Sequence, residues 1–412
     1  MPGFFFSLVL LALLPLTSVA QVAQEFGLAE ILSTVERSSP ELAAVRLLRG
    51  QSTAERTTAR AYPNPEIDVS SGPWRSRIGA PSGTVTGISI AQLLDLPSVR
   101  EARSRVADAG MDSAESQILL ARLAVGYQTR QAFFELMRRQ EDERLVAEDS
   151  RLLQDIQRRV QVRVDVGEAP RFELVKAEAE VLSAQNAAAS ARLRTEEARA
   201  LLRRLAANAL PGQFEARGAL PPRGEVPPRA ALQREVMTQH PHLRVLIAER
   251  ERALARLEYE RALRQPQPTL HAGQARDPET TQMLLGISVP LPLWNRREGP
   301  MAQALSQVEL AAAQIDVAHA QLARELDSAY ARLSIARRQI QTFEAGLLRS
   351  AQASLDVAQA AWRFGERSFL EVLDAQRTLR AARSDYNSAR YEDHSAWLDI
   401  ERLRARDPFL VE

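Results

Sequence analysis

The sequence contains no cysteine, and this absence removes several structural and functional possibilities. Without cysteine the chain has no disulfide framework, no thiolate zinc site and no N-terminal cysteine for lipidation. An excess of charge of one sign is also lacking, because 53 basic and 52 acidic residues leave a formal net charge of only +1. The charges are interspersed, without the basic stripe that holds nucleic acid phosphates, so nucleic acid binding is not expected. Any membrane attachment must come from the polypeptide itself.

Long hydrophobic runs are confined to the first twenty residues. Residues 4–16 are apolar, and residues 18–20 are small enough for cleavage before Gln21. This pattern predicts a signal peptide over residues 1–20, and an N-terminal membrane anchor is the alternative because lysine and arginine are missing before the run. Beyond it, no stretch approaches the roughly 20 apolar residues that a spanning helix needs. A protein of this sequence that spans a bilayer must therefore do so with strands.

An internal repeat organises the rest of the chain. Two halves match at four places in the same order, with offsets between 198 and 203 residues. The strongest match aligns Gly167 and Glu168, without a gap, on Gly365 and Glu366. We therefore predict two structural repeats over 21–208 and 229–407, an irregular equatorial linker over 209–228 and a C-terminal tail over 408–412.

Proline is absent from residues 98–169 and 301–407, which permits long helices because an interior proline costs a helix about 3 kcal/mol. The second window shows alternating spacings of four and three, typical of a coiled coil. This predicts one helix over 296–363, on the order of 100 Å long. A helix over 99–164 is expected to turn at Gly167 and to return as two shorter helices, 171–208 and 242–263. The predicted seam consists of Val308, Ala312, Ile315, His319, Leu322, Leu326, Ala329, Leu333, Ala336, Ile340, Phe343 and Leu347.

Short strands are predicted at the opposite end from the turns, and the fold class is mainly α with a small β portion. Four strands cannot close a barrel, and an open sheet edge in lipid leaves backbone groups without partners. A membrane role therefore requires several protomers to share one barrel, while the alternative is a pair of soluble hairpins that cap a helical bundle. The predicted strands cover residues 66–74, 84–91, 269–275 and 282–290.

Three segments carry a resemblance to a known family. Residues 363–376, RFGERSFLEVLDAQ, resemble the second hairpin tip of the TolC-type outer membrane factor family, which has an aromatic residue, glycine, a polar pair, serine or threonine, and then an acidic residue before Val-Leu-Asp-Ala-Gln. Residues 166–173, VGEAPRFE, and 286–296, GISVPLPLWNR, are similar to its heavy-metal efflux branch, which is related to CzcC. The resemblance extends over essentially the whole mature chain.

This resemblance implies a homotrimer in the outer membrane of a Gram-negative bacterium. Four strands per protomer would form a twelve-stranded β-barrel in outer-membrane lipid, continued across the periplasm by a duplicated long-helix coiled-coil tunnel. The expected partners are a periplasmic membrane fusion (adaptor) protein and an inner-membrane RND transporter, which supplies the energy. Neither catalytic residues nor a cofactor are expected.

The resemblance also implies roles for residues at the two tips. A ring of carboxylates at a narrow mouth would favour cations and raise carboxyl pKa values, whereas ordinary pairing of helix charges at i and i+4 is the alternative. Glu371 stands where the family usually has aspartate, which affects the diameter of such a ring. Residues expected to constrict the periplasmic mouth, through acidic rings and interhelical links, are Trp362, Arg367, Glu371 and Asp374. Candidates for adaptor contact, or simply for forming the turns, are Gly167, Glu168, Arg171, Gly365 and Glu366.

No metal site is predicted from the histidines. His240 and His242 flank a proline and lack nearby carboxylate or thiol ligands, and His319 falls on the coiled-coil seam. The favoured function is a passive export duct for heavy-metal cations, with drug efflux or type I secretion as alternatives. A periplasmic coiled-coil scaffold is the alternative from a different class. An enzyme is disfavoured because no nucleophile constellation or glycine-rich phosphate loop stands out.

Overall fold

The computed structural model describes residues 24–75, 82–220 and 226–410. The predicted signal peptide therefore lies outside the described residues. The elements in chain order are β1 (Gln24–Phe26), α1 (Leu28–Ser38), α2 (Pro40–Arg60), β2 (Glu66–Trp74), β3 (Gly83–Leu93), α3 (Pro97–Asp165), α4 (Arg171–Leu205), β4 (Phe214–Ala216), α5 (Arg229–Gln239), α6 (Pro241–Ala262), β5 (Thr269–Arg276), β6 (Thr281–Ser288), α7 (Glu298–Thr342), the π-helix η1 (Phe343–Leu347), α8 (Leu348–Arg363) and α9 (Phe369–Leu403).

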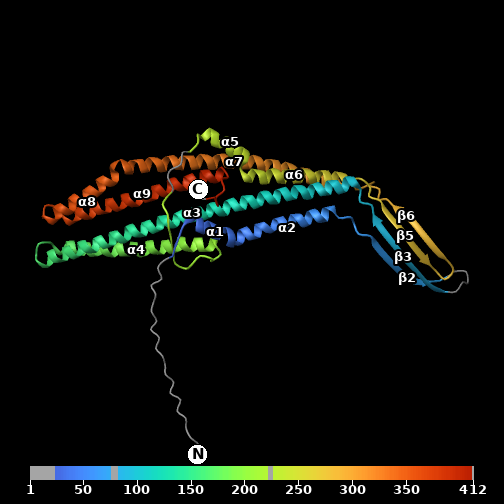
Figure 1. The fold of residues 1–412 in the computed structure, drawn as a ribbon, viewed down its shortest axis with the longest axis horizontal. Helices are drawn as coiled ribbons and strands as arrows, with labels where there is room; N and C mark the ends of the chain where they lie inside the picture. The colour runs from blue at the N-terminus through green and yellow to red at the C-terminus, as the bar shows by residue number, and fades with distance from the viewer. Residues whose placement is uncertain (1–23, 76–81, 221–225, 411–412) are drawn as a thin grey trace, which may run out of the picture.

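The molecule is a long bundle of helices with a sheet at one end and two helical hairpin tips at the other (Figure 1). The longest helix, α3, runs through the bundle, with α2 and α6 packed along its first part and α4 along its second part. The second hairpin, α8 with α9, lies beside α3 and α4. Among the described residues, no helix is both long enough and apolar enough to cross a membrane.

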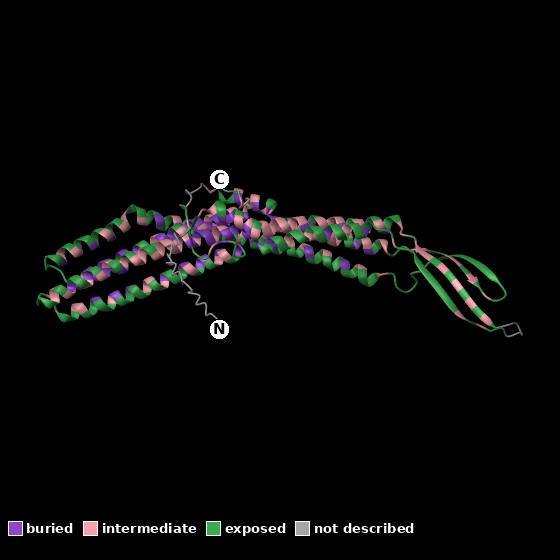
Figure 2. Ribbon diagram, turned by 60° about the horizontal axis from the view of Figure 1, so that its bottom comes forward, coloured by how far each residue is buried: buried purple, intermediate pink, exposed green. Residues whose placement is uncertain are grey.

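The sheet consists of four antiparallel strands in the order β2-β3-β5-β6. Ile67 pairs with Ile90, and Ala272 with Leu285, so the alternation of side chains gathers apolar residues on one face. Met283 and Leu285 on this face are 86% and 87% exposed. Figure 2 shows the strands as largely exposed, whereas buried residues concentrate in the middle of the bundle. The apolar face therefore has no cover from the described part of this protomer.

The helix predicted over 296–363 is interrupted, which corrects the prediction of one continuous helix. Gly346 has φ of 150° within the π-helix η1, between α7 and α8. Glycine takes this conformation readily because it has no Cβ, so a window without proline still contained a break. The ring of Phe343 packs on Tyr386 of α9, with centroids 5.8 Å apart, and Leu347 beyond it is 45% exposed rather than on the seam.

The predicted seam is correct in only part of α7. From Leu322 to Ile340 the predicted positions are buried, but earlier in the helix the buried positions are Ala304, Ala311 and Ala318. The early part of α7 packs against α6, whereas the later part packs against α9. A change of partner helix shifts the buried stripe, and spacing alone does not reveal which helix is the partner.

The region predicted as an irregular linker contains β4, which forms a parallel pair with β1. The rings of Phe26 and Phe214 meet edge to face, with centroids 5.7 Å apart. The buried guanidinium of Arg199 on α4 donates through Nε to the carbonyl of Phe214 over 2.7 Å. The start of the described chain and the segment after α4 are thus joined at the middle of the molecule.

Candidate functional site: the two hairpin tips

The two tips have the same backbone geometry. Gly167, after α3, has φ of +80°, and Gly365, after α8, has φ of +75°. In the first tip the N–H of Glu168 donates to the carbonyl of Arg163 over 2.7 Å. In the second tip the N–H of Glu366 donates to the carbonyl of Ala361 over 2.9 Å. This is the Schellman arrangement, in which a left-handed glycine ends a helix and satisfies its last carbonyls. Both glycines are therefore required by the turns themselves.

Replacing Gly167 or Gly365 by alanine is expected to cost about 1–2 kcal/mol of stability each, because an L-residue is strained at positive φ. No heavy atom lies within 4 Å of the position that a Cβ would take at either glycine, so the cost is conformational rather than steric. Gly212→Ala, which also meets nothing within 4 Å and lacks a positive φ, is the matched control. The unfolding midpoint of the solubilised protein measures the difference, and midpoints equal to that of the control would contradict the prediction.

At the start of α9, Glu371 pairs locally. Ser368 is the N-cap, and its N–H donates to Glu371 Oε1 over 3.4 Å. Arg367 Nη1 donates to Glu371 Oε2, and this hydrogen bond is the main reason why the pKa of the Glu371 carboxyl lies below its ordinary value. Within the protomer, Glu371 therefore forms the ordinary i and i+4 charge pair with Arg367 that was the alternative to an acidic ring. Asp374, one turn later, has an exposed side chain.

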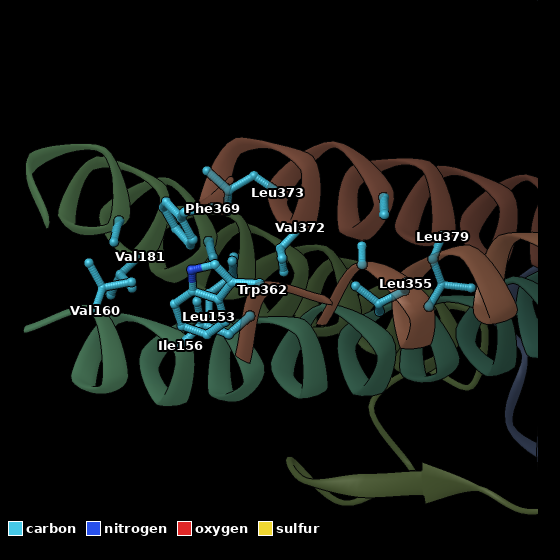
Figure 3. Packing of buried hydrophobic residues seen from close by; sticks show 14 of the residues in the cluster. Leu153, Ile156, Val160, Val181, Leu355, Trp362, Phe369, Val372, Leu373 and Leu379 are labelled. Carbon is cyan, nitrogen blue, oxygen red and sulfur yellow. The ribbon is translucent and has the colours of Figure 1, made fainter. Parts of the chain in front are cut away.

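Trp362 lies in the interior of the protomer rather than on its surface. It is only 4% exposed and packs among Leu153, Ile156 and neighbouring side chains between the two hairpins (Figure 3). The guanidinium of Arg163 on α3 lies 5.4 Å from its ring centroid, and Arg163 Nη1 is 3.5 Å from its carbonyl oxygen. Trp362 thus lies where it can link the two hairpins.

The remaining predicted tip residues lie at the outer ends of the hairpins. Arg171 is the first residue of α4 and is exposed, as are Glu168 and Glu366 in the turns. Apolar side chains accompany them on the surface, with Phe172 in the first tip and Phe364 in the second. The structure therefore brings the predicted residues together at one end of the molecule. Trp362 is buried there.

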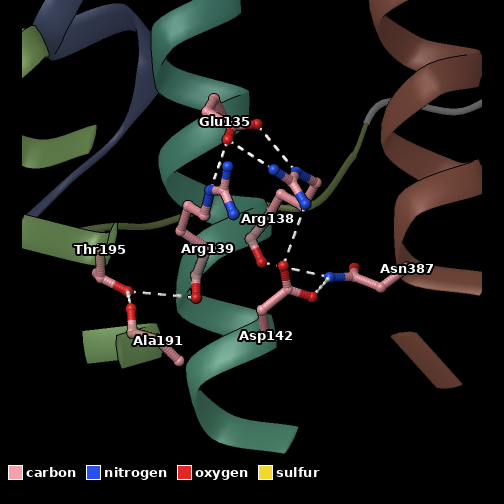
Figure 4. A network of polar contacts seen from close by, with 7 residues as sticks. All are labelled: Glu135, Arg138, Arg139, Asp142, Ala191, Thr195 and Asn387. Carbon is pink, nitrogen blue, oxygen red and sulfur yellow. Dashed lines mark hydrogen bonds and ion pairs between the residues drawn. The ribbon is translucent and has the colours of Figure 1, made fainter. Parts of the chain in front are cut away.

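Further from the tips, a polar network joins α3 to α9 (Figure 4). Arg138 lies between Glu135, at 2.7 Å, and Asp142, at 3.1 Å. Asn387 on α9 donates through Nδ2 to Asp142 Oδ1 over 2.7 Å. Burial opposes ionisation of Glu135, but hydrogen bonds and charges from Arg138 and Arg139 prevail and lower its carboxyl pKa. The sequence did not predict this link between α3 and α9, because nothing in the local spacing pairs residues that are so distant in sequence.

The histidines have structural contacts. His240 Nδ1 accepts the N–H of His242 over 3.2 Å at the start of α6, and burial lowers the pKa of His240 to about 4. His319 Nδ1 lies 3.2 Å from the sulfur of Met237. Among the described residues, no group of three or more histidine, aspartate or glutamate side chains is placed to hold a metal ion.

Comparisons with known proteins agree with this architecture. The family model described as outer membrane efflux protein matches residues 31–208 and 232–405. The cobalt-zinc-cadmium resistance protein CzcC of Cupriavidus metallidurans is 28% identical over 353 residues, covering 84% of this chain and 82% of that protein. The Campylobacter jejuni outer membrane channel CmeC has a similar structure, with a TM-score of 0.80 at 18% identity, covering 92% of this chain and 85% of that chain. The outer membrane protein VceC of Vibrio cholerae also has a similar structure, with a TM-score of 0.76 at 16% identity. This match covers 92% of this chain and 96% of that chain.

The family model matches both halves of the chain. The structural matches extend over the helical portion and the β portion that continues from it. The resemblance predicted from the tip motifs is confirmed, as are the mainly α fold class, the export duct and the outer-membrane location. The chain belongs to the outer membrane efflux protein family and is an outer-membrane efflux channel with its helical tunnel in the periplasm.

Proposed function

We propose that this channel is the passive exit duct of a tripartite RND-type system that exports heavy-metal cations. The observation that supports this cargo is the likeness to a cobalt-zinc-cadmium resistance protein over most of both chains. The duct binds its cargo only weakly or not at all, needs no cofactor and catalyses no reaction, because the inner-membrane transporter supplies the energy. Drug efflux and type I secretion are the competing cargo assignments.

The proposed assembly is a homotrimer with one shared barrel of twelve strands. Two features of the sheet support it. Within the described residues, the outer edges of β2 and β6 are unpaired, and a strand edge in lipid needs a partner. One face of the sheet is apolar and uncovered, as a lipid-facing surface requires. The division into repeats 21–208 and 229–407 likewise stays a proposal, supported by the equivalent geometry of the two tips.

The tips are the proposed periplasmic mouth and adaptor-docking end. Glu371 and Asp374 are the proposed acidic groups of the mouth, and within the protomer Glu371 accepts a hydrogen bond from Arg367. Exposed apolar side chains support contact with a partner protein, since Phe364 is 82% exposed next to Gly365. The proposed adaptor contacts are Gly167, Glu168, Arg171, Gly365 and Glu366. The proposed partners are a periplasmic adaptor protein and an inner-membrane RND transporter.

Deleting the gene is expected to lower tolerance of at least one of cobalt, zinc, cadmium, nickel, copper and silver, while tolerance of a drug panel stays unchanged. Restoring the wild-type gene should restore tolerance. Unchanged tolerance of every metal would overturn the cargo assignment, and lost drug tolerance would favour drug efflux.

Protein from the strain with the restored wild-type gene tests the assembly. Light scattering on the protein extracted from the outer membrane is expected to give three chains per particle. A soluble monomer would contradict the shared barrel.

A further inference from the structure

The connection between β6 and α7, residues 289–297, is largely apolar and exposed. It lies where the sheet joins the helical bundle (Figure 1). Leu291 is 66% and Trp294 is 94% exposed, and the side chains of Val289 and Leu293 are exposed as well. No described part of this protomer covers them. Large apolar side chains left uncovered next to one another mark a surface that contacts something else.

The strands β5 and β6 are too short to cross the hydrocarbon core by themselves. Each has eight residues, whereas a tilted membrane strand needs about 9–11. Eight residues of about 3.3 Å each, tilted by about 40°, span roughly 20 Å along the membrane normal, against an apolar band about 25 Å tall. The apolar surface therefore has to continue beyond one end of these two strands.

Charged residues show at which end it continues. At the end away from the helices, the turn between β5 and β6 contains Asp277 and Glu279, directly after Arg276. In the other direction, residues 280–295 contain no charged side chain, and Arg296 is the first. A charge in hydrocarbon is energetically unfavourable. Lipid contact can therefore extend from β6 only toward the helices, along residues 289–295.

The backbone of this connection suits a surrounding with little water. Pro290 and Pro292 have no N–H that would need a partner. The N–H of Leu293 donates to the carbonyl of Leu291 over 2.9 Å, within the segment itself. An unpaired backbone donor in lipid costs several kcal/mol. The segment thus has fewer donors that require water than an ordinary loop of the same length.

The end of the connection has side chains typical of a membrane surface. Trp294 is followed by Arg296, which is exposed and forms no ion pair with any described residue. Arg297 instead pairs with the buried carboxylate of Glu260 on α6 at 2.5 Å, which ties the segment to the bundle. Tyr62, between α2 and β2, is a second exposed aromatic residue near this boundary. Tryptophan and tyrosine concentrate at membrane–water interfaces, and guanidinium groups bind phosphates.

We propose that residues 289–296 form a membrane-contact segment that continues the lipid-facing surface of the sheet into the periplasmic leaflet of the outer membrane. Leu291 and Leu293 contact phospholipid acyl chains, Trp294 lies at the level of the glycerol groups, and Arg296 binds the phosphates. The segment supplies the height that β5 and β6 lack and sets the level of the channel in the membrane. This inference rests on the proposed lipid-facing sheet and is independent of the cargo.

Spin labelling of the protein in vesicles of phosphatidylethanolamine and phosphatidylglycerol tests the proposal. Because the chain has no cysteine, each single substitution provides one nitroxide site. Leu291→Cys and Leu293→Cys are expected to collide with oxygen, which concentrates in lipid, more than with a water-soluble nickel chelate. Their oxygen-to-nickel ratio should be several-fold above that of Glu279→Cys, the reference in water. Leu285→Cys on β6 is the reference in lipid.

The outcomes of this experiment separate the proposal from the one on which it rests. A ratio at Leu291 and Leu293 as low as at Glu279 would place the segment in water and overturn the proposal. Few collisions with either reagent would mean that a second copy of the chain covers the segment, which would overturn it as well. Lipid contact at Leu285 alone refutes only the membrane-contact segment, whereas its absence at Leu285 also refutes the lipid-facing sheet.

The fluorescence of Trp294 gives a second readout in a chain without introduced cysteine. Phospholipids brominated near the glycerol end of their acyl chains should quench the wild type more than phospholipids brominated near the methyl end. Trp294→Phe should lose most of this quenching, because Trp362 and Trp397 pack within the helical bundle. Trp74→Phe is the matched control and should keep it, since Trp74 lies on the face of β2 opposite to Ile67. Undiminished quenching in Trp294→Phe would contradict the proposal.

Discussion

Trp362→Ala is expected to lower the stability of the periplasmic hairpins by about 3–5 kcal/mol, the usual cost of removing a large buried aromatic side chain. The indole fills the space between α8, α9 and α3, beside Phe369, with ring centroids 6.0 Å apart. Its loss also removes the ring over which Arg163 lies. The expected result is a looser connection between the two hairpins near their tips, because this packing joins one hairpin to the other.

The denaturant midpoint followed by helical circular dichroism measures this loss. Phe364→Ala is the matched control, since Phe364 is two residues away in the same tip and is 82% exposed. Its replacement should change the midpoint little, because it removes little buried surface. Trp362→Phe should lie between the wild type and Trp362→Ala. Equal midpoints for the variants Trp362→Ala and Phe364→Ala would show that the indole does not hold the hairpins together.

Gly126→Leu is expected to cost about 2–4 kcal/mol, although leucine is the better helix former, because overpacking and lost hydrogen bonds exceed the gain in propensity. A Cβ at Gly126 would lie 2.3 Å from Pro408 Cγ and 2.8 Å from Phe409 Cε2, so the segment after α9 must move away. That segment is also held by Arg130, whose Nε donates to the carbonyl of Pro408 over 2.7 Å. Arg122 adds an ion pair to Asp407 at 2.7 Å.

Limited proteolysis of the C-terminal segment and the denaturant midpoint measure the effect. Gly50→Ala is the control, since Gly50 lies within α2 and a Cβ added there would meet nothing within 4 Å, so alanine should add roughly 0.5–1 kcal/mol of stability. The Gly126→Leu variant should be cleaved near its C-terminus, and the control should not. A Gly126→Leu protein as resistant and as stable as wild type would mean that the segment does not need the space at Gly126.

Features that depend on local chemistry could be predicted from the sequence. Proline-free windows predicted the long helices, since a helix is formed by hydrogen bonds four residues apart. Gly167 and Gly365 predicted the turns between the helices of the two hairpins, because few other residues adopt a positive φ. The predicted strand over residues 66–74 coincides with β2. The order of the tip motifs was sufficient to predict the family.

Features that depend on which distant segments meet could be recognised only in the folded chain. It placed Trp362 inside the protomer, packed between the two hairpins. It revealed the break at Gly346, and it showed that the buried stripe of α7 shifts where the helix changes its partner. It also brought Asp149 to Gln376 across 227 positions. Periodicity reports which face of a helix is buried, but packing between segments far apart in the chain determines what that face contacts.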